Sequence, residues 1–150
     1  SEASKTGKFL ICGRFMPRYE DYLRDYLNHP TVECLGYLED VQAILRGSHA
    51  LVLPSLAEGS ALVTYEARAC GCVLLVSEAS GAIGEHMKEA LVHKPGDVET
   101  LRSQIDMLAT DRKLLRRLQT NSLAGARELS WDKAAKPLVA AYRKCLKSSE

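Results

Sequence analysis

The sequence predicts an α/β fold in which a mostly parallel, Rossmann-like sheet is flanked by helices and followed by a helical C-terminal third. Two observations lead to this prediction. Short apolar runs alternate with longer amphipathic segments over residues 9–93, and apolar residues recur at helical spacing from residue 98 onward. The 150 residues suit a single domain, 1–150, built around one hydrophobic core.

Apolar runs of strand length mark the predicted sheet. Most of them end at Gly, Pro or Ser, and their continuous apolar character indicates burial on both faces. The runs are Phe9–Cys12, Val32–Leu35, Ala50–Leu53, Val73–Val76 and Ala90–Val92. The segments between them are long enough for one to three helical turns and would form the crossovers. These segments are Tyr19–Leu27, Asp40–Leu45, Leu62–Ala69 and Ile83–Lys88.

The C-terminal third has the apolar spacing of helices. The pattern from Val98 to Leu108 predicts one helix, and the pattern from Leu114 to Leu118 predicts a second, capped by Asp111. A third helix is expected from Trp131 to Tyr142, with a kink or a later start caused by Pro137.

Charge and cysteine usage exclude several classes of function. Lys and Arg number 20 against 19 Asp and Glu, so there is no basic surplus for nonspecific nucleic-acid binding. No apolar run approaches the ~18 residues that cross a bilayer, and residues 1–8 lack a signal-peptide pattern, so a cytoplasmic protein is expected. The 5 cysteines are expected to be reduced core residues. Because Cys70-Gly71-Cys72 lacks a two-residue spacer and no histidine pairs with it, no metal site is expected. No cofactor is expected either.

The densest signal for chemistry follows the third apolar run. In an open α/β sheet, ligands bind beyond the carboxyl ends of the strands, where this segment should lie. Gly59 and Ser60 would open the next helix, so its first backbone N–H groups can face an anion such as a diphosphate. Glu66 lies eight residues after Glu58, a little over two helical turns, and can accept both hydroxyls of a ribose. Glu58, at the mouth of the predicted site, can bind sugar hydroxyls. The plainer alternative makes Glu58 a helix-start charge and Glu66 a solvated helix residue, since the spacing alone is a weak motif.

An ordered set of motifs extends this signal over most of the chain. The motifs are Leu35–Leu38, Ala50–Ser55, Glu58–Ala67, Ala69–Gly71, Ser80-Gly81, Pro95–Asp97 and Leu129–Trp131. With these motifs the sequence resembles the C-terminal, donor-binding domain of the group 1, or family 4, retaining glycosyltransferases of GT-B fold. The resemblance implies a hexosyltransferase-type enzyme that transfers a sugar from a nucleotide-diphosphate sugar to a glycan, lipid or small-molecule acceptor, without a protein-bound metal.

The resemblance also implies roles for individual residues. Glu58 would be the catalytic carboxylate that contacts hydroxyls of the donor sugar, and Glu66 would contact the ribose of the nucleotide. Backbone groups of the intervening residues would face the sugar and the diphosphate: Gly59, Ser60, Ala61, Leu62 and Val63. Tyr37 and Leu38 would border the base. The helix after Ser130 would pack toward the enzyme's other domain, which makes Trp131 structural rather than catalytic.

Two departures from the family pattern limit these expectations. The N-terminal domain of such enzymes, which carries the acceptor site, has no counterpart here, so this chain alone should be inactive. The basic first strand of the donor domain is also missing, and in a 3-2-1-4-5-6 order it would be the middle one. Either the sheet closes differently, for example by exchange with another copy, or the turn around Arg14 is the basic one. Arg14 therefore stays a candidate phosphate ligand, with a surface cation as the alternative.

Other functions remain open at this point. The main alternative is a non-catalytic α/β module that binds nucleotides or a protein partner, in which case Glu58→Ala and Glu66→Ala would leave ligand affinity unchanged. Four basic residues form a patch on one predicted helix: Arg112, Lys113, Arg116 and Arg117. By default this patch is a solvated helix face. The speculative alternative is a peripheral contact with the inner face of an anionic membrane. Apolar surface left by the missing strand or domain can drive self-association.

Overall fold

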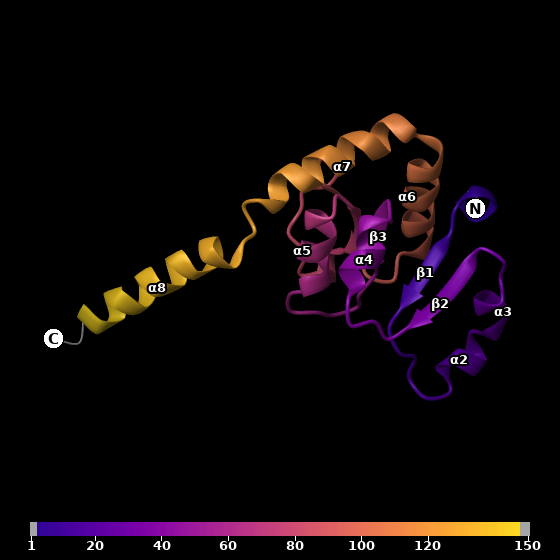
Figure 1. Ribbon diagram of the computed structural model, residues 1–150, viewed down its shortest axis with the longest axis horizontal. Coiled ribbons are helices and arrows are strands. Elements are labelled where there is room, and N and C mark those ends of the chain that lie inside the picture. The colour runs from indigo at the N-terminus through magenta and orange to yellow at the C-terminus, as the bar shows by residue number, and fades with distance from the viewer. Residues whose placement is uncertain (1–2, 148–150) are drawn as a thin grey trace.

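The computed structural model describes residues 3–147 and confirms the α/β class (Figure 1). The strands coincide with the predicted apolar runs to within one residue at each end: β1 (Phe9–Cys12), β2 (Val32–Gly36), β3 (Ala50–Leu53), β4 (Val73–Ser77) and β5 (Ala90–His93). Every pair of neighbouring strands is parallel. The crossovers therefore run along the faces of the sheets, as the alternation of strand and helix predicts.

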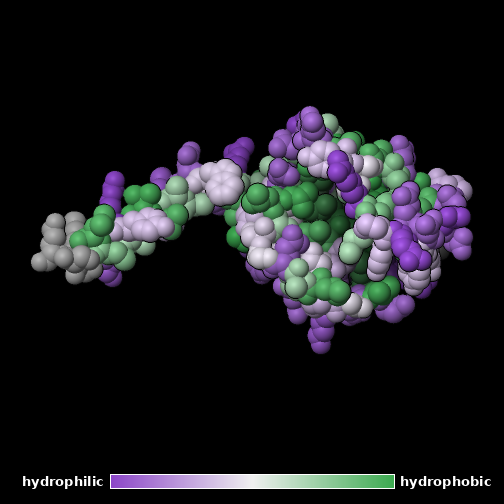
Figure 2. Space-filling view, turned by 90° about the horizontal axis from the view of Figure 1, so that it is seen from below, coloured by the Kyte–Doolittle hydropathy of each residue, from purple (hydrophilic) through white to green (hydrophobic). Residues whose placement is uncertain are grey.

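The strands form two sheets instead of the single sheet that was expected. β1 pairs with β2, and β3, β4 and β5 form a separate sheet in that order. Among the described residues, β1 and β3 each keep one edge without a strand partner. The arrows of β1 and β2 point downward in Figure 1, and Figure 2, seen from below, shows a hollow in which apolar side chains gather.

The core lies on both faces of the three-stranded sheet, and β4 at its centre is buried along its whole length. Since side chains alternate along a strand, Val73 and Leu75 face one side and Leu74 and Val76 the other. The first face is covered by leucines of α6 (Val98–Thr110) and α7 (Arg112–Ala126). The second face is covered by α4 (Val41–Arg46) and α5 (Leu62–Ala69).

The helices against the three-stranded sheet begin in two different ways. α4, α6 and α7 start at Asp40, Asp97 and Asp111, whose carboxylates accept hydrogen bonds from backbone N–H groups of the first turn. α5 starts at Ala61, which has no side-chain acceptor to offer. The N–H groups at the start of α5 therefore lack the cap that the other three helices have.

Two predicted helices differ from the structure. The stretch 19–27 forms two short helices, α2 (Tyr19–Tyr22) and α3 (Arg24–Leu27), neither of which buries a residue, so no packing holds them in one rod. The stretch 83–88 is not helical. A single 3-10 turn, η1 (Glu78–Ser80), follows β4, and Met87 has a φ of 62° and donates its N–H to the carbonyl of Ala90.

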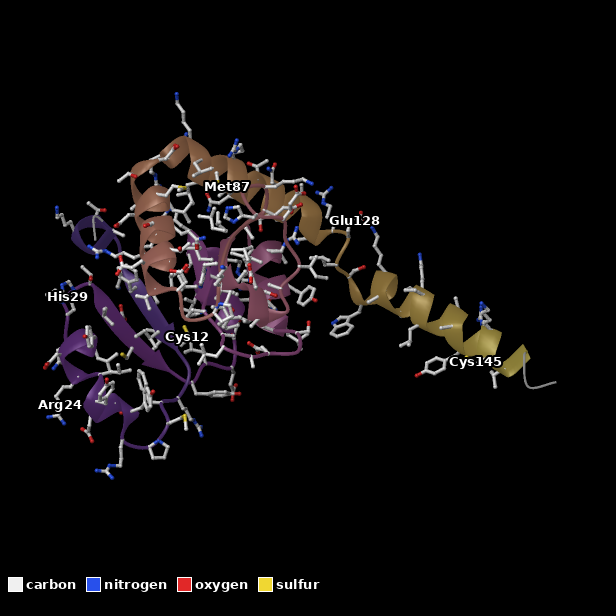
Figure 3. The ribbon with its side chains drawn as sticks, turned by 180° about the vertical axis from the view of Figure 1, so that it is seen from behind. Cys12, Arg24, His29, Met87, Glu128 and Cys145 are labelled. Atoms are coloured by element: carbon white, nitrogen blue, oxygen red, sulfur yellow. The ribbon has the colours of Figure 1, made fainter. Side chains whose placement is uncertain are left out.

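The chain ends differ in how they pack. α1 (Ala3–Thr6) contacts α6, where the backbone N–H of Ala3 donates to Asp106 at 3.0 Å. α8 (Trp131–Lys147) begins at Trp131, so Pro137 does not delay its start. Figure 3 shows Glu128 where the chain leaves α7, and α8 extends from there, away from the sheets. Trp131 is 77% exposed.

The cysteines do not all have the core positions that the sequence predicted. Cys72 is buried, whereas Cys12, Cys34 and Cys145 are exposed. Cys12 and Cys34 lie in the two-stranded sheet, which is less covered than the other sheet, and Cys145 lies on the projecting α8 (Figure 3). No disulfide joins the cysteines that the structure describes.

Candidate functional site

The loop between β3 and α5 holds Glu58 at the carboxyl edge of the three-stranded sheet. The hydroxyl of Ser55 donates to Oε2 of Glu58 at 2.8 Å. The backbone carbonyl of Ser55 in turn accepts a hydrogen bond of 2.5 Å from the hydroxyl of Ser77, the last residue of β4. Glu58 is exposed, while Ser77 is buried. The end of the central strand thus fixes the start of the loop, and Ser55 orients the carboxylate toward an accessible face.

Glu66 lies on α5, eight residues after Glu58, and is half-buried. Among the described residues its carboxylate has no hydrogen-bond or ion-pair partner. The start of the helix is shaped by Thr64, whose hydroxyl donates to the carbonyl of Ala61 at 2.7 Å. The residues expected to face the ligand by their backbone form this uncapped start: Gly59, Ser60, Ala61, Leu62 and Val63. α5 coincides with the predicted helical segment, whereas Gly59 and Ser60, which were expected to open the helix, lie in the loop before it.

Arg14 and Tyr37 come together at the carboxyl ends of β1 and β2. The guanidinium of Arg14 lies over the Tyr37 ring, 5.2 Å from its centroid, in cation–π geometry. Leu38 follows, half-buried. Because these strands belong to the smaller sheet, the structure places Arg14, Tyr37 and Leu38 together but in a different sheet from Glu58 and Glu66.

The end of β5 carries polar groups that the sequence did not single out as functional. His93 is buried, its Nδ1 lies 3.1 Å from the side-chain oxygen of Gln104, and its Nε2 has no partner among the described residues. Asp97 follows, and hydrogen bonds from the backbone N–H and the hydroxyl of Thr100 hold the pKa of its carboxyl below the usual value. Asp97 thus caps α6, while the contact with Gln104 ties the end of β5 to the same helix.

The remaining described residues offer no metal cluster, and a hollow lies away from this edge. Within residues 3–147 no group of three or more His, Cys, Asp or Glu side chains could hold a metal ion. A hollow of about 520 Å³ lies beside α6 and α7 and includes none of the candidate donor-binding residues, although two residues of the basic patch, Lys113 and Arg117, line it. Its lining residues are Met87, Met107, Asp111, Lys113, Leu114 and Arg117. In the part of the chain that the structure describes, no helix is both long and apolar enough to span a bilayer.

Comparison with known proteins identifies the family. The family described as "Glycosyl transferases group 1" matches residues 2–111. The chain belongs to the group 1 glycosyltransferases. Among curated relatives, this group 1 chain is 28% identical over 126 residues to the N,N'-diacetylbacillosaminyl-diphospho-undecaprenol alpha-1,3-N-acetylgalactosaminyltransferase of Campylobacter jejuni. That match covers 83% of the chain and 34% of the relative, so the chain spans about a third of that enzyme's length.

Solved structures show the same architecture. Anabaena HepE in complex with UDP superposes with a TM-score of 0.76 at 19% identity, covering 92% of this chain and 41% of HepE. The C-terminal domain of a group 1 glycosyltransferase, LpcC, from Francisella tularensis superposes with a TM-score of 0.71 at 20% identity, covering 81% of this chain and 72% of that domain. The fold of this group 1 chain is thus that of a GT-B glycosyltransferase domain, as its sequence predicted.

Proposed function

We propose that this group 1 chain is the donor-binding part of a retaining glycosyltransferase that uses a nucleotide-diphosphate sugar. The observation that carries the proposal is the placement of Glu58, oriented by Ser55, beside the uncapped start of a helix that also bears Glu66. Carboxylates suit the hydroxyls of a sugar and a ribose, and the helix start suits the diphosphate between them. The structures of HepE with UDP and with UDP-glucose support this class of ligand.

Each residue has a defined task in this proposal. Glu58 accepts hydrogen bonds from the donor sugar and fixes its orientation, and Glu66 accepts them from the ribose. The N–H groups at the start of α5 meet the negative charge that grows on the departing diphosphate, which lowers the barrier for breaking the sugar–phosphate bond. Arg14 and Tyr37 present a flat, paired surface at the neighbouring sheet, which suits a base.

The acceptor belongs to another part of the enzyme in this proposal. Its class is a glycan, a lipid or a small molecule, and this chain supplies no acceptor face of its own. The chain therefore binds the donor and orients it, while transfer with retention of configuration needs the acceptor side. A chain that binds a nucleotide sugar and transfers little is the expected behaviour.

Calorimetric titration of the purified chain tests the proposal. UDP, GDP, ADP and their common sugar conjugates are titrated into the wild type, into Glu66→Ala and into Glu33→Ala. Glu33 lies on β2, pairs with Lys8 and is the control for the loss of one carboxylate outside the candidate site. We expect one nucleotide to bind and Glu66→Ala to weaken it by about tenfold or more, since a charge-assisted hydrogen bond contributes about 1.5–3 kcal/mol.

The control decides whether that loss is specific. Glu33→Ala should bind like the wild type, and both variants should keep the wild-type circular dichroism spectrum. A folded wild type that binds none of these ligands would contradict the proposal, and equal affinity in Glu66→Ala would favour the alternative α/β module.

A further inference from the structure

The segment that follows β4 touches the Glu58 loop backbone to backbone. Gly81 has a φ of +64°, in the left-handed region that favours glycine. A Cβ built on Gly81 would lie 2.1 Å from the carbonyl oxygen of Gly59 and 3.1 Å from the Cα of Ser60. No side chain fits there, so glycine alone lets the two backbones meet. The hydroxyl of buried Ser80 donates to the carbonyl of Ser77 at 2.7 Å and holds the turn in place.

The same segment is tied to α5 by a buried arginine. Arg68 is 3% exposed, and its Nη1 donates to the carbonyl of Ile83 at 2.5 Å. Its Nε reaches the carbonyl of Ser122 on α7 at 3.4 Å, and Nη2 lies 3.9 Å from Glu89. Gly125 makes the room for this guanidinium, because a Cβ there would lie 2.1 Å from Nη2.

These contacts join the two glutamate-bearing elements by a path that the chain order does not suggest. Arg68 follows Glu66 by two residues on α5, holds Ile83, and thereby fixes the segment whose Gly81 contacts Gly59. Gly59 is the neighbour of Glu58. A displacement of residues 81–83 would therefore move the loop that carries Glu58 relative to the helix that carries Glu66.

We propose that Gly81 and Arg68 are positioning residues, which hold residues 81–83 as a backbone support for Gly59 and so set Glu58 relative to Glu66. The inference rests on the donor-binding function proposed above. A binding group is effective when its neighbours lock its geometry to within about half an ångström. Residues 81–83 provide such a support for the backbone of Gly59, next to Glu58.

The test compares two glycine variants that carry the same backbone strain. Gly81→Ala puts a methyl group against the Gly59 carbonyl. Gly71→Ala is the matched control, since Gly71 has a φ of +79° with nothing within 4 Å and precedes β4 at the opposite edge of the sheet. Affinity for the nucleotide sugar that the wild type binds is measured by calorimetry. We expect Gly81→Ala to weaken binding by about tenfold or more and Gly71→Ala to stay within about twofold of the wild type.

A second readout does not depend on ligand. The backbone amide resonances of Gly59 and Ser60 in the free chain should move in Gly81→Ala and in Arg68→Met but not in Gly71→Ala. If Gly81→Ala fails to fold, Arg68→Met decides the matter through the same resonances and through affinity.

The outcomes separate this inference from the proposed function. A wild type that binds no nucleotide sugar refutes the donor-binding function, and the amide resonances then decide the positioning role alone. Equal losses of affinity in Gly81→Ala and Gly71→Ala overturn the inference, because strain by itself would explain both. Unmoved Gly59 and Ser60 resonances in both Gly81→Ala and Arg68→Met overturn it as well.

Discussion

Replacing Arg68 with methionine should destabilise the domain by about 2–3 kcal/mol. The substitution removes a short hydrogen bond from Nη1 to the Ile83 carbonyl at 2.5 Å and a longer one to the Ser122 carbonyl at 3.4 Å. A hydrogen bond that involves a charged group contributes about 1.5–3 kcal/mol, and the part-buried Ile83 carbonyl left without its donor adds to the loss. Two features keep the loss moderate: methionine refills much of the volume, and Glu89 keeps a bond from the N–H of Glu85 at 2.9 Å.

Urea unfolding followed by circular dichroism measures this loss. With a urea dependence of about 2 kcal/mol per molar, a loss of 2–3 kcal/mol lowers the midpoint by about 1–1.5 M. Arg102→Met is the control, because Arg102 lies 3.9 Å from Glu99 with its side chain 58% exposed, and such pairs contribute about 0–1 kcal/mol. A midpoint for Arg68→Met within the spread of Arg102→Met would refute the view that the guanidinium ties α5, α7 and residues 81–89 together.

Two further predictions concern single titratable groups. Burial, with the neighbouring Cys70 as a smaller cause, raises the pKa of Cys72 to about 11. Iodoacetamide at pH 8 should therefore alkylate exposed Cys34 in the native chain and leave Cys72 unmodified until urea unfolds the chain. Equal alkylation rates for the two cysteines would contradict the buried position of Cys72. The lowered pKa of Asp97 stabilises the fold above the unfolded-state value of about 3.9, and this contribution is lost as the pH falls through the folded-state pKa. The melting temperature of the wild type should therefore exceed that of Asp97→Asn at pH 6, and the difference should shrink as the pH falls below the unfolded-state value. A difference independent of pH would show that the charge plays no part.

The strands could be predicted from the sequence because burial on both faces leaves a local mark. β4 is the clearest case, since all of its residues are buried and its apolar run is continuous. The division into two sheets left no such mark. β1 and β3 do not pair, and the apolar runs have the same pattern whether they belong to one sheet or to two.

The helix predicted at residues 83–88 is absent because groups in this segment form hydrogen bonds with residues outside it. The carbonyl of Ile83 is held by Arg68, fifteen residues earlier, and Nδ1 of His86 accepts the N–H of Val92 at 2.9 Å. The N–H of Met87 bonds the carbonyl of Ala90 instead of the preceding turn. Backbone groups used in this way are not available for helical bonds, and nothing within the segment itself announces those partners.

The residues of the candidate site also differ in whether a local sequence pattern marks them. The sequence singles out Glu58 and Glu66 as candidates, because a carboxylate beside a Gly-Ser turn after a strand has local meaning, and their roles stay predictions. Ser77 and Arg68 could not, since their contacts reach residues 22 and 15 positions away. Gly81 had a visible signal, the Ser80-Gly81 turn, but only the contact with Gly59 shows what the missing side chain is for.

The start of α5 links the stability of the fold to the proposed function. An aspartate at an N-cap stabilises a helix by about 1 kcal/mol, and the chain uses one at α4, α6 and α7. Ala61 at the start of α5 forgoes that stabilisation, and an aspartate there would place a negative charge where the proposed diphosphate lies. Two other hydrogen bonds stabilise α5: the hydroxyl of Thr64 donates to the Ala61 carbonyl, and Arg68 binds the other end of the helix to α7. α5 is thereby held by contacts that leave its first N–H groups open to a ligand.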